Sequence, residues 1–326
     1  MQVEADPVVL QVLQLRARLL AAIRQFFAER DFIEVETPSI VPSPGMDVHL
    51  EALEVRDPKG KPVGWLATSP EYQMKRLLSA GARRVFQVCR AYRGEEHGRH
   101  HEREFTMLEW YRVGGDADAV MRDVEELVLT TARAVAGDGT VQTGGRQPPP
   151  GGRWPRWELD GLFRELLGAG MTDEKGLREA LARRGSRPGA DESWEDLFFR
   201  ACIDVVEPEV ATRGACFLTG YPALLGAMAR RRTRQPEVAE RFEGFVAGVE
   251  LVNGYEELTD PAEQEERLRA LAERHRRTAG EELPVDPGFL DALRRGLPPC
   301  AGAALGVDRL VMLLLRGSDI ADGMYR

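Results

Sequence analysis

A long hairpin with a heavily charged loop, spanning residues 84 to 112, restricts the possible folds of this chain more than any other feature. Apolar residues recur at alternate positions on both sides of the loop, which is typical of two half-buried antiparallel strands. Three of the chain's five histidines fall within five residues of the loop, among arginines and glutamates. The pattern therefore predicts an antiparallel hairpin whose loop is a candidate binding site.

Composition narrows the classes of function. The chain has 326 residues and a formal net charge of −9, which argues against a broad nucleic-acid surface because such surfaces are normally basic. No apolar run approaches the ~20 residues that span a membrane, and the first residues lack the pattern of a signal peptide. The four cysteines form no Cys-x-x-Cys pair, as expected of free thiols in a reducing cytoplasm. The loop is therefore interpreted first as a small-molecule site in a cytoplasmic protein.

Amphipathic spacing and helix-start residues predict the other elements. The run Thr68-Ser69-Pro70-Glu71 combines a capping hydroxyl, a proline and an acid, so a helix is expected from here to about Ser79. Residues 137–157, rich in glycine and proline, are expected to form a surface insertion or linker. The remaining expectations are a helix over 8–30, strands over 32–36, 64–67 and 251–254, helical patterns over 158–235, a capped helix from Asp260, and a strand, glycine turn and buried helix over 303–315.

The second arm of the hairpin carries polar residues in the middle of an apolar strand. Because residues two apart share a strand face, Phe105, Met107, Glu109 and Tyr111 line one side of it. A buried carboxylate needs a partner, since an isolated buried charge is very costly. That partner is either a cation of the protein, as in a structural salt bridge, or the ammonium group of a ligand. Strand context alone leaves both interpretations open.

A second acidic pair lies in residues 242–250. If Ala247 and Gly248 form a two-residue hairpin turn, Glu250 pairs with Phe245 and shares a sheet face with Glu243. Two carboxylates brought together in this way repel each other unless a cation lies between them. Magnesium is the natural candidate, because it takes oxygen ligands and binds substrate phosphates as well. The alternative is two exposed acids on a solvated hairpin.

These parts combine into one hypothesis, in which the charged loop folds over ATP. Asn253, Tyr255 and Glu257 follow the acidic hairpin closely, and Arg309 lies in the first helical turn after Gly306, where an arginine suits a polyphosphate. The hypothesis assigns phosphates to Arg93, His101 and Arg309, a stacked base to Phe105, magnesium to Glu243 and Glu250, and a dicationic amino substrate to Glu71, Glu109, Tyr111 and Glu257.

Three motifs resemble those of class II aminoacyl-tRNA synthetases. "FIEVETPSI" resembles motif 1, "YRGEEHGRHHEREFTMLEWY" motif 2 and "GAALGVDRLVMLLL" motif 3. The stretches "TSPEYQMKRLL", "FTMLEWYR" and "VELVNGYEELTD" are similar to the lysyl-tRNA synthetase branch. The motif 1 helix is expected near residue 8, which leaves no room for the anticodon-binding barrel of those synthetases. The layout is therefore similar to the elongation factor P–lysine lysyltransferases, a family of truncated paralogues.

The resemblance implies a fold and an assembly. It implies an α+β fold with an antiparallel sheet flanked by helices, in a single catalytic domain over residues 1–326 with a flexible insertion near 137–157 and no anticodon-binding domain. Motif 1 builds a dimer interface in this class, so a homodimer is expected. The implied site residues fall into three sets: substrate contacts at Ser69, Pro70, Glu71, Glu109, Tyr111, Asn253 and Glu257; ATP contacts at Arg93, Gly94, Glu95, His101, Glu102, Phe105, Glu250, Leu251, Gly306 and Arg309, of which Arg93 and Arg309 are catalytic; and magnesium ligands at Glu243 and Glu250.

The implied activity is ATP-dependent activation of (R)-β-lysine or lysine as an aminoacyl-adenylate, followed by transfer to a lysine side chain of elongation factor P. One alternative is a minimal lysyl-tRNA synthetase-like enzyme that acts on tRNA, which the acidic balance disfavours. Another is a non-catalytic regulatory paralogue that binds ATP or lysine. Gly94 and Glu102 stand where the family pattern has asparagines, and Glu102 adds negative charge near the phosphates. These two departures predict weaker ATP binding.

Overall fold

An eight-stranded sheet forms the centre of the protein. The structure is a computed structural model that describes residues 7–45, 51–94, 98–136, 153–279 and 283–324. Across the sheet the strands follow the order β1 (Ile33–Glu34), β5 (Arg84–Tyr92), β6 (Glu104–Val113), β13 (Cys300–Gly306), β12 (Val249–Glu256), β11 (Arg241–Val246), β8 (Ala215–Thr219) and β7 (Arg156–Glu158). All neighbours pair antiparallel except at the two edges, where β1 with β5 and β7 with β8 are parallel.

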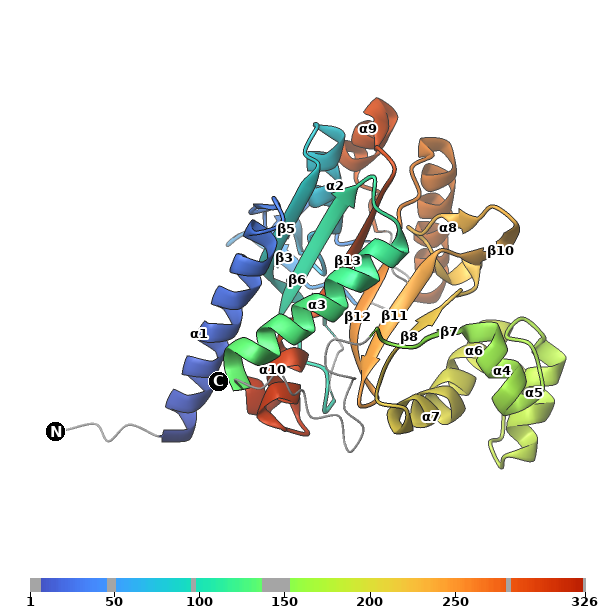
Figure 1. The fold of residues 1–326 in the computed structure, drawn as a ribbon. Coiled ribbons are helices and arrows are strands. Elements are labelled where there is room, and N and C mark those ends of the chain that lie inside the picture. Colours follow the sequence, from blue (N-terminus) through green and yellow to red (C-terminus); the bar gives the residue numbers. More distant parts are fainter. Residues whose placement is uncertain (1–6, 46–50, 95–97, 137–152, 280–282, 325–326) are drawn as a thin grey trace.

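One face of the sheet is covered by three helices, α1 (Pro7–Ala28), α3 (Ala117–Ala136) and α10 (Val307–Leu315), seen in front of the strands in Figure 1. Apolar residues of α1 recur at three- and four-residue steps, so Leu19, Ile23 and Phe27 all reach the core. They meet Leu108 and Trp110, the side chains of β6 that point away from the predicted site. The helices therefore anchor β6 from behind and leave its polar face to the other side.

The opposite face is covered less completely. Helices α2 (Glu71–Ser79), α8 (Pro261–Ala279) and α9 (Pro287–Gly296) pack over one part of it. A helical group packs behind β8 and β11 with a core of its own, and consists of α4 (Leu159–Leu167), α5 (Glu174–Arg183), α6 (Trp194–Ala201), the π-helical turn Cys202–Val206 and α7 (Glu207–Thr212). Short strands form two further sheets, β2 (Ile40–Val41), β4 (Pro62–Leu66) and β3 (Glu54–Arg56) in one, and β9 (Arg231–Arg232) and β10 (Gln235–Ala239) in the other.

The structure confirms the two hairpins that carried the hypothesis. Strands β5 and β6 pair in continuous register from Arg84–Arg112 to Tyr92–Glu104. The turn between β11 and β12 has two residues with positive φ, Ala247 (54°) and Gly248 (80°), as a two-residue hairpin requires. Glu250 pairs with Phe245, as expected, although the register then shifts by one residue before Gly244.

Three expectations about elements were wrong in part. The strand expected over 32–36 is reduced to Ile33–Glu34, because it pairs only with β5 at the sheet edge. Residues 213–235 contain no α-helix, only the short 3-10 helix Ala223–Leu225. Strand β8 lies there, a short apolar run that periodicity cannot distinguish from a buried helix. Most of the expected insertion, residues 137–152, lies outside the described residues. Its end is not a linker, since Trp154 is buried with its ring centroid 5.0 Å from that of Phe217.

Among the helices that the structure describes, none combines the length and the apolar character needed to cross a membrane.

Candidate active site

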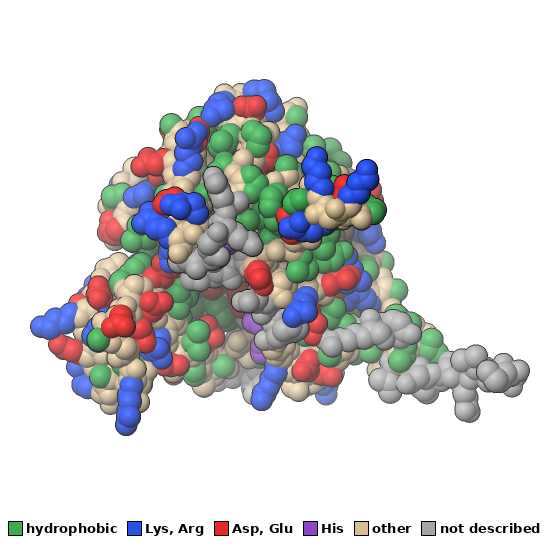
Figure 2. All heavy atoms as spheres, turned by 180° about the vertical axis from the view of Figure 1, so that it is seen from behind, with side chains coloured by type: hydrophobic (Ala, Val, Ile, Leu, Met, Phe, Trp, Pro, Cys, Tyr) green, Lys and Arg blue, Asp and Glu red, His purple; other side chains and the backbone are tan. Residues whose placement is uncertain are grey.

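A cavity of about 1010 Å³ opens on the less covered face of the sheet. Its floor consists of residues of β6, β12 and β13, and its walls come from α2, the charged loop after β5 and the helical group. Figure 2, which views the molecule from this side, shows a hollow near the centre of the face. The chain order of the sheet explains the convergence: β13, from the end of the chain, lies between β6 and β12.

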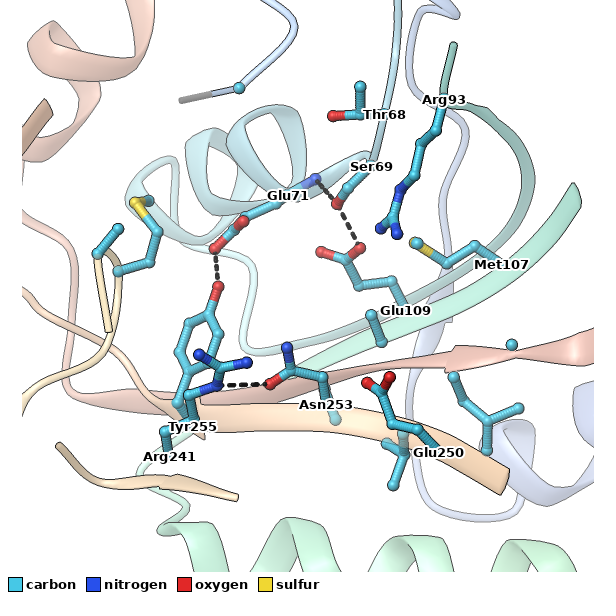
Figure 3. A pocket seen from close by; sticks show the side chains of 18 of the residues that line it. Thr68, Ser69, Glu71, Arg93, Met107, Glu109, Arg241, Glu250, Asn253 and Tyr255 are labelled. Atoms are coloured by element: carbon cyan, nitrogen blue, oxygen red, sulfur yellow. Dashed lines mark hydrogen bonds between the residues drawn. The ribbon is translucent and has the colours of Figure 1, made fainter. Parts of the chain in front are cut away.

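Glu109 is at the buried end of this cavity. Only 2% of the residue is exposed, and its carboxylate accepts hydrogen bonds from two hydroxyl groups. Ser69 Oγ donates to Oε2 at 2.7 Å and Tyr111 OH donates to Oε1 at 2.5 Å. Figure 3 shows the carboxylate extending from β6 toward Ser69 at the start of α2. Glu109 therefore faces the cavity with hydroxyl partners, and no ion pair to it occurs among the described residues.

Two further carboxylates, Glu71 and Glu257, share the cation of Lys75. Lys75 lies one turn after Glu71 on α2 and is 1% exposed. Its Nζ is 2.6 Å from Oε1 of Glu71, and it also forms an ion pair with Oε2 of Glu257. The hydroxyl of Tyr255 donates to the same Oε1 of Glu71, as Figure 3 shows. Both described partners of the Glu71 carboxylate therefore bind one oxygen. Oε1 of Glu257 is buried and has no hydrogen-bond partner among the described residues.

Burial and neighbouring charges shift the pKa values of Glu109, Glu257 and Lys75. Burial raises the pKa of Glu109 to about 7, helped by the charge of Glu71 and opposed by the hydrogen bonds from Tyr111 and Ser69. It raises the pKa of Glu257 to about 8, although the ammonium of Lys75 opposes the rise. Burial alone would lower the pKa of Lys75, but the charges of Glu257 and Glu71 outweigh it and raise that pKa. Desolvated acids of this kind favour a bound cation, which would pair with their ionised forms.

The other end of the cavity is lined by cations and an aromatic ring. The guanidinium of Arg93 lies over the ring of Phe105, 5.1 Å from its centroid. Arg309, near the start of α10, donates from Nε to the carbonyl of His100 at 3.0 Å and from Nη1 to the carbonyl of Glu250 at 2.6 Å. Burial and the positive charge of Arg309 lower the pKa of His100. Partly exposed cations beside an aromatic ring are suited to polyphosphate and base recognition.

A buried hydrogen-bond network connects β6, which carries Phe105, with α10, which carries Arg309, and with α1. Asp308 is 1% exposed and accepts from the backbone N–H of Thr106 at 2.5 Å. Its second oxygen accepts from Nη1 of Arg16 at 2.5 Å, and Nη2 of the same arginine donates to Thr106 Oγ1 at 2.5 Å. Thr106 and Asp308 are the chain neighbours of Phe105 and Arg309. Arg16 of α1 thus holds the two parts of the cationic end in register.

The acidic hairpin supplies a third region. Glu250 lines the cavity, whereas the carboxylate of Glu243 lies beside it and is bound by Arg241 Nη2 at 2.6 Å and by the Tyr221 hydroxyl at 2.6 Å. Burial raises the pKa of Glu243 to about 7; Arg241 opposes the rise and the charge of Glu250 adds to it. In the part of the chain that is described, no group of three potential metal ligands occurs. A cation here would need oxygen atoms from a substrate as well as the two carboxylates.

Comparison with known proteins assigns the chain to a family. The model of the class II tRNA synthetases (D, K and N) matches residues 1–324. A protein named elongation factor P–(R)-β-lysine ligase from Salmonella gallinarum is 39% identical over 313 residues, which cover 94% of this chain and 92% of that protein. Its namesake from Salmonella typhi is 40% identical over the same shares. The chain belongs to the elongation factor P–(R)-β-lysine ligase family. It is therefore a ligase of the class II synthetase type, with the α+β fold that the sequence predicted.

Most of the site residues that were expected from the sequence line this same cavity. The lining includes, from the substrate set, Ser69, Glu71, Glu109, Tyr111, Asn253 and Glu257, and from the ATP set, Arg93, His101, Glu102, Phe105, Glu250, Leu251, Gly306 and Arg309. Three assignments fall elsewhere. Glu243, of the magnesium set, lies beside the cavity and does not line it. Pro70 is buried and does not line the cavity, and Gly94 lies against Glu51, whose carbonyl accepts its N–H at 2.8 Å. Glu95 lies outside the described residues.

The sequence did not reveal the cationic side chains that pair with the predicted carboxylates. Lys75 was visible as the basic partner of Glu71 at the i,i+4 spacing, but its burial was not. Arg241 lies two residues before Glu243 on the same strand face and was likewise overlooked. Gly302 also escaped notice: a Cβ there would lie 2.3 Å from a ring carbon of Tyr111, so only glycine lets that ring lie against β13.

Proposed function

We propose that this protein activates (R)-β-lysine or lysine with ATP and transfers the aminoacyl group to a lysine side chain of elongation factor P. The observation that carries the proposal is the division of one cavity into an acidic end and a cationic end. Three carboxylates, Glu71, Glu109 and Glu257, suit an amino acid with two ammonium groups. Arg93 and Arg309 at the other end suit a polyphosphate. The names of the related ligases agree with this chemistry.

The first step joins the two ends of the cavity. The substrate carboxylate attacks the α-phosphorus of ATP, the bond to the pyrophosphate breaks, and an aminoacyl-adenylate forms. No side-chain nucleophile is required, so the protein contributes by alignment and by neutralising charge. The carboxylates fix both ammonium groups, Arg93 and Arg309 bind the phosphates, and Phe105 stacks on the base. Because Arg309 is already held by two carbonyl groups, little reorganisation is needed.

Magnesium is part of the proposal. Glu250, with Glu243 beside it, would hold the ion, whose chemistry is to neutralise the phosphate oxygens. The like charges of the two acids support this assignment, as does the ion pair of Glu250 with Arg309 at the end of the cavity proposed for the phosphates. Glu243 would share its carboxylate between the ion and Arg241.

In the second step the amine of the acceptor lysine attacks the adenylate carbonyl. The bond to AMP breaks, AMP leaves as the anion, and the amine loses a proton as the amide forms. We place this side chain at the part of the cavity that α6 and the π-helical turn line with Phe199 and Ile203. We further propose a cytoplasmic homodimer: Leu10 and Leu13 of α1 and Ile33 of β1 are exposed apolar residues in the motif 1 region. Light scattering at micromolar concentration tests the dimer, and a monomer would contradict it.

The decisive experiment measures pyrophosphate exchange dependent on (R)-β-lysine or lysine, followed by mass spectrometry of elongation factor P after incubation with ATP and each amino acid. We expect exchange with at least one isomer and a mass increase on a lysine of the factor. Exchange at background level with folded protein would contradict the enzyme proposal.

The alternative acceptor is tRNA. It would need a basic surface beside the cavity, whereas Figure 2 shows basic and acidic side chains intermixed on this face. Labelled aminoacyl transfer to tRNA, with none to elongation factor P, would favour this alternative.

A further inference from the structure

The acidic end of the cavity contains a cation of its own. Lys75 is 1% exposed and lies behind Glu71 and Glu257, and it is not among the described residues that line the cavity. A lysine is almost never buried without a purpose or a partner, and this one has two carboxylates. It binds one oxygen of each acid and leaves Oε2 of Glu71 and Oε1 of Glu257 without a described hydrogen bond. Each acid is therefore fixed from behind, and its second oxygen remains for a ligand.

Ionisable side chains from α2, β6, β12 and β13 surround Lys75. Glu71 belongs to α2, Glu109 and Tyr111 to β6, Tyr255 and Glu257 to β12 and its end, and Cys300 to β13. Nζ of Lys75 lies 5.9 Å from the ring centroid of Tyr111 and 5.3 Å from that of Tyr255. Burial raises the pKa of both phenols and of the Cys300 thiol, so these three groups stay neutral. When all three acids are ionised, the single ammonium of Lys75 leaves the pocket with a net charge of minus two, which the two ammonium groups of a diamino acid would balance.

We propose that Lys75 is a specificity-determining positioning residue: its fixed ammonium holds Glu71 and Glu257 in place and favours the ionised form of Glu257, so that the pocket pairs best with an amino acid that has two ammonium groups. An amino acid with one ammonium group leaves a buried carboxylate unpaired, which is costly. The inference rests on the proposed function, because it assumes that a diamino acid occupies this pocket. It adds that the selectivity depends on a residue that the substrate does not touch.

Removing the ammonium of Lys75 should change the pKa of Glu257, which would not follow if Lys75 only supported the fold. The pKa of Glu257 is raised to about 8 even with Lys75 beside it. Without that ammonium the pKa rises further, because an opposite charge no longer favours the ionised form. At neutral pH Glu257 is then harder to ionise, and a neutral acid rejects an apolar chain end much less strongly than a carboxylate does.

The test compares Lys75→Met with Lys75→Arg, which keeps the charge, using pyrophosphate exchange. Lysine and (R)-β-lysine serve as diamino substrates, and norleucine serves as the analogue without the distal ammonium. For Lys75→Met we expect discrimination against norleucine to fall at least tenfold, and the acidic limb of kcat/KM for the diamino acid to move up by about one pH unit or more. The KM for ATP should stay within about twofold, and Lys75→Arg should restore both readouts. Lys175→Met, at an exposed lysine, is the matched control.

The outcomes separate the inference from the proposed function. If the unsubstituted protein shows no exchange, the proposed function fails, and the inference is then tested on lysine and norleucine binding by calorimetry with the same variants. If Lys75→Met retains its discrimination and its acidic limb, Lys75 has no role in selectivity. Equal losses in Lys75→Met and Lys75→Arg, with unchanged discrimination, would also overturn the inference. Lys75→Gln, which still donates hydrogen bonds to both acids, replaces Lys75→Met if circular dichroism shows that the latter does not fold.

Discussion

The two ends of the cavity carry charges of opposite sign and differ in how deeply those charges are buried. At the acidic end, Glu109 and Glu257 are each 2% exposed; Glu257 is paired with the internal cation of Lys75, and Glu109 accepts hydrogen bonds from hydroxyl groups. At the cationic end, Arg309 is partly exposed, and its guanidinium is held by backbone carbonyl groups. A buried charge without its partner is costly, whereas an exposed one is solvated. Selectivity should therefore depend mainly on the acidic end, and the cationic end should tolerate change better.

The largest effect is expected from Glu109→Gln. Removing one partner of a buried charge pair should reduce kcat/KM for the diamino acid roughly 10²- to 10³-fold, because the glutamine cannot neutralise an ammonium group. The KM for ATP should change little. Pyrophosphate exchange at varied amino-acid concentration measures the loss, and Glu126→Gln at an exposed site is the control. A loss confined to the KM for ATP would show that the two ends are not separate.

A smaller effect is expected at the cationic end, from Arg309→Met. Loss of a charged hydrogen-bond donor should raise the KM for ATP about 10- to 100-fold, and the KM for the amino acid should change little. Steady-state exchange with varied ATP measures the change. Arg24→Met, which removes an exposed arginine paired with Glu34, is the matched control. If Arg309→Met altered selectivity between lysine and norleucine, the division of the cavity would be wrong.

The acidic end should also make stability depend on pH. The pKa of Glu109 is raised to about 7 and that of Glu257 to about 8 in the folded chain, well above the values in an unfolded chain. Between about pH 4.5 and 8 the folded state binds more protons, so the ligand-free protein should become less stable as the pH rises. Thermal unfolding from pH 5 to 8 should show a fall of roughly a few degrees. The fall should shrink in Glu257→Gln, and a rise over this range would contradict the expectation.

The smallest effect is expected from Glu102→Asn. This residue lines the cationic end and adds negative charge where phosphates are expected. Its removal should lower the KM for ATP about two- to threefold, the scale of a partly solvated charge interaction. Glu104→Gln, more exposed and outside the cavity, is the control. An increase in the KM for ATP would indicate that Glu102 itself supports the nucleotide.

Local pattern was sufficient for much of this site. Alternation along residues 105–111 placed Glu109 and Tyr111 on the cavity face, and the two residues Ala247 and Gly248 set the pairing of Glu250 with Phe245. The sequence could not give the partners of these acids. Whether Glu257 pairs with a ligand or with Lys75 depends on how α2 packs against the end of β12. The register shift between Gly244 and Phe245 could not be predicted from the sequence either.

The sequence by itself determined the two hairpins, the turn and the acid and base composition of the cavity, because periodicity and turn chemistry act over a few residues. Only the tertiary structure decided which charges are buried. The insertion of β13 between β6 and β12 brings Arg309 beside Glu250, and the packing of α2 buries Lys75 behind Glu71 and Glu257. Burial is a property of all the packed elements together, and it fixes the pKa values on which the proposed selectivity depends.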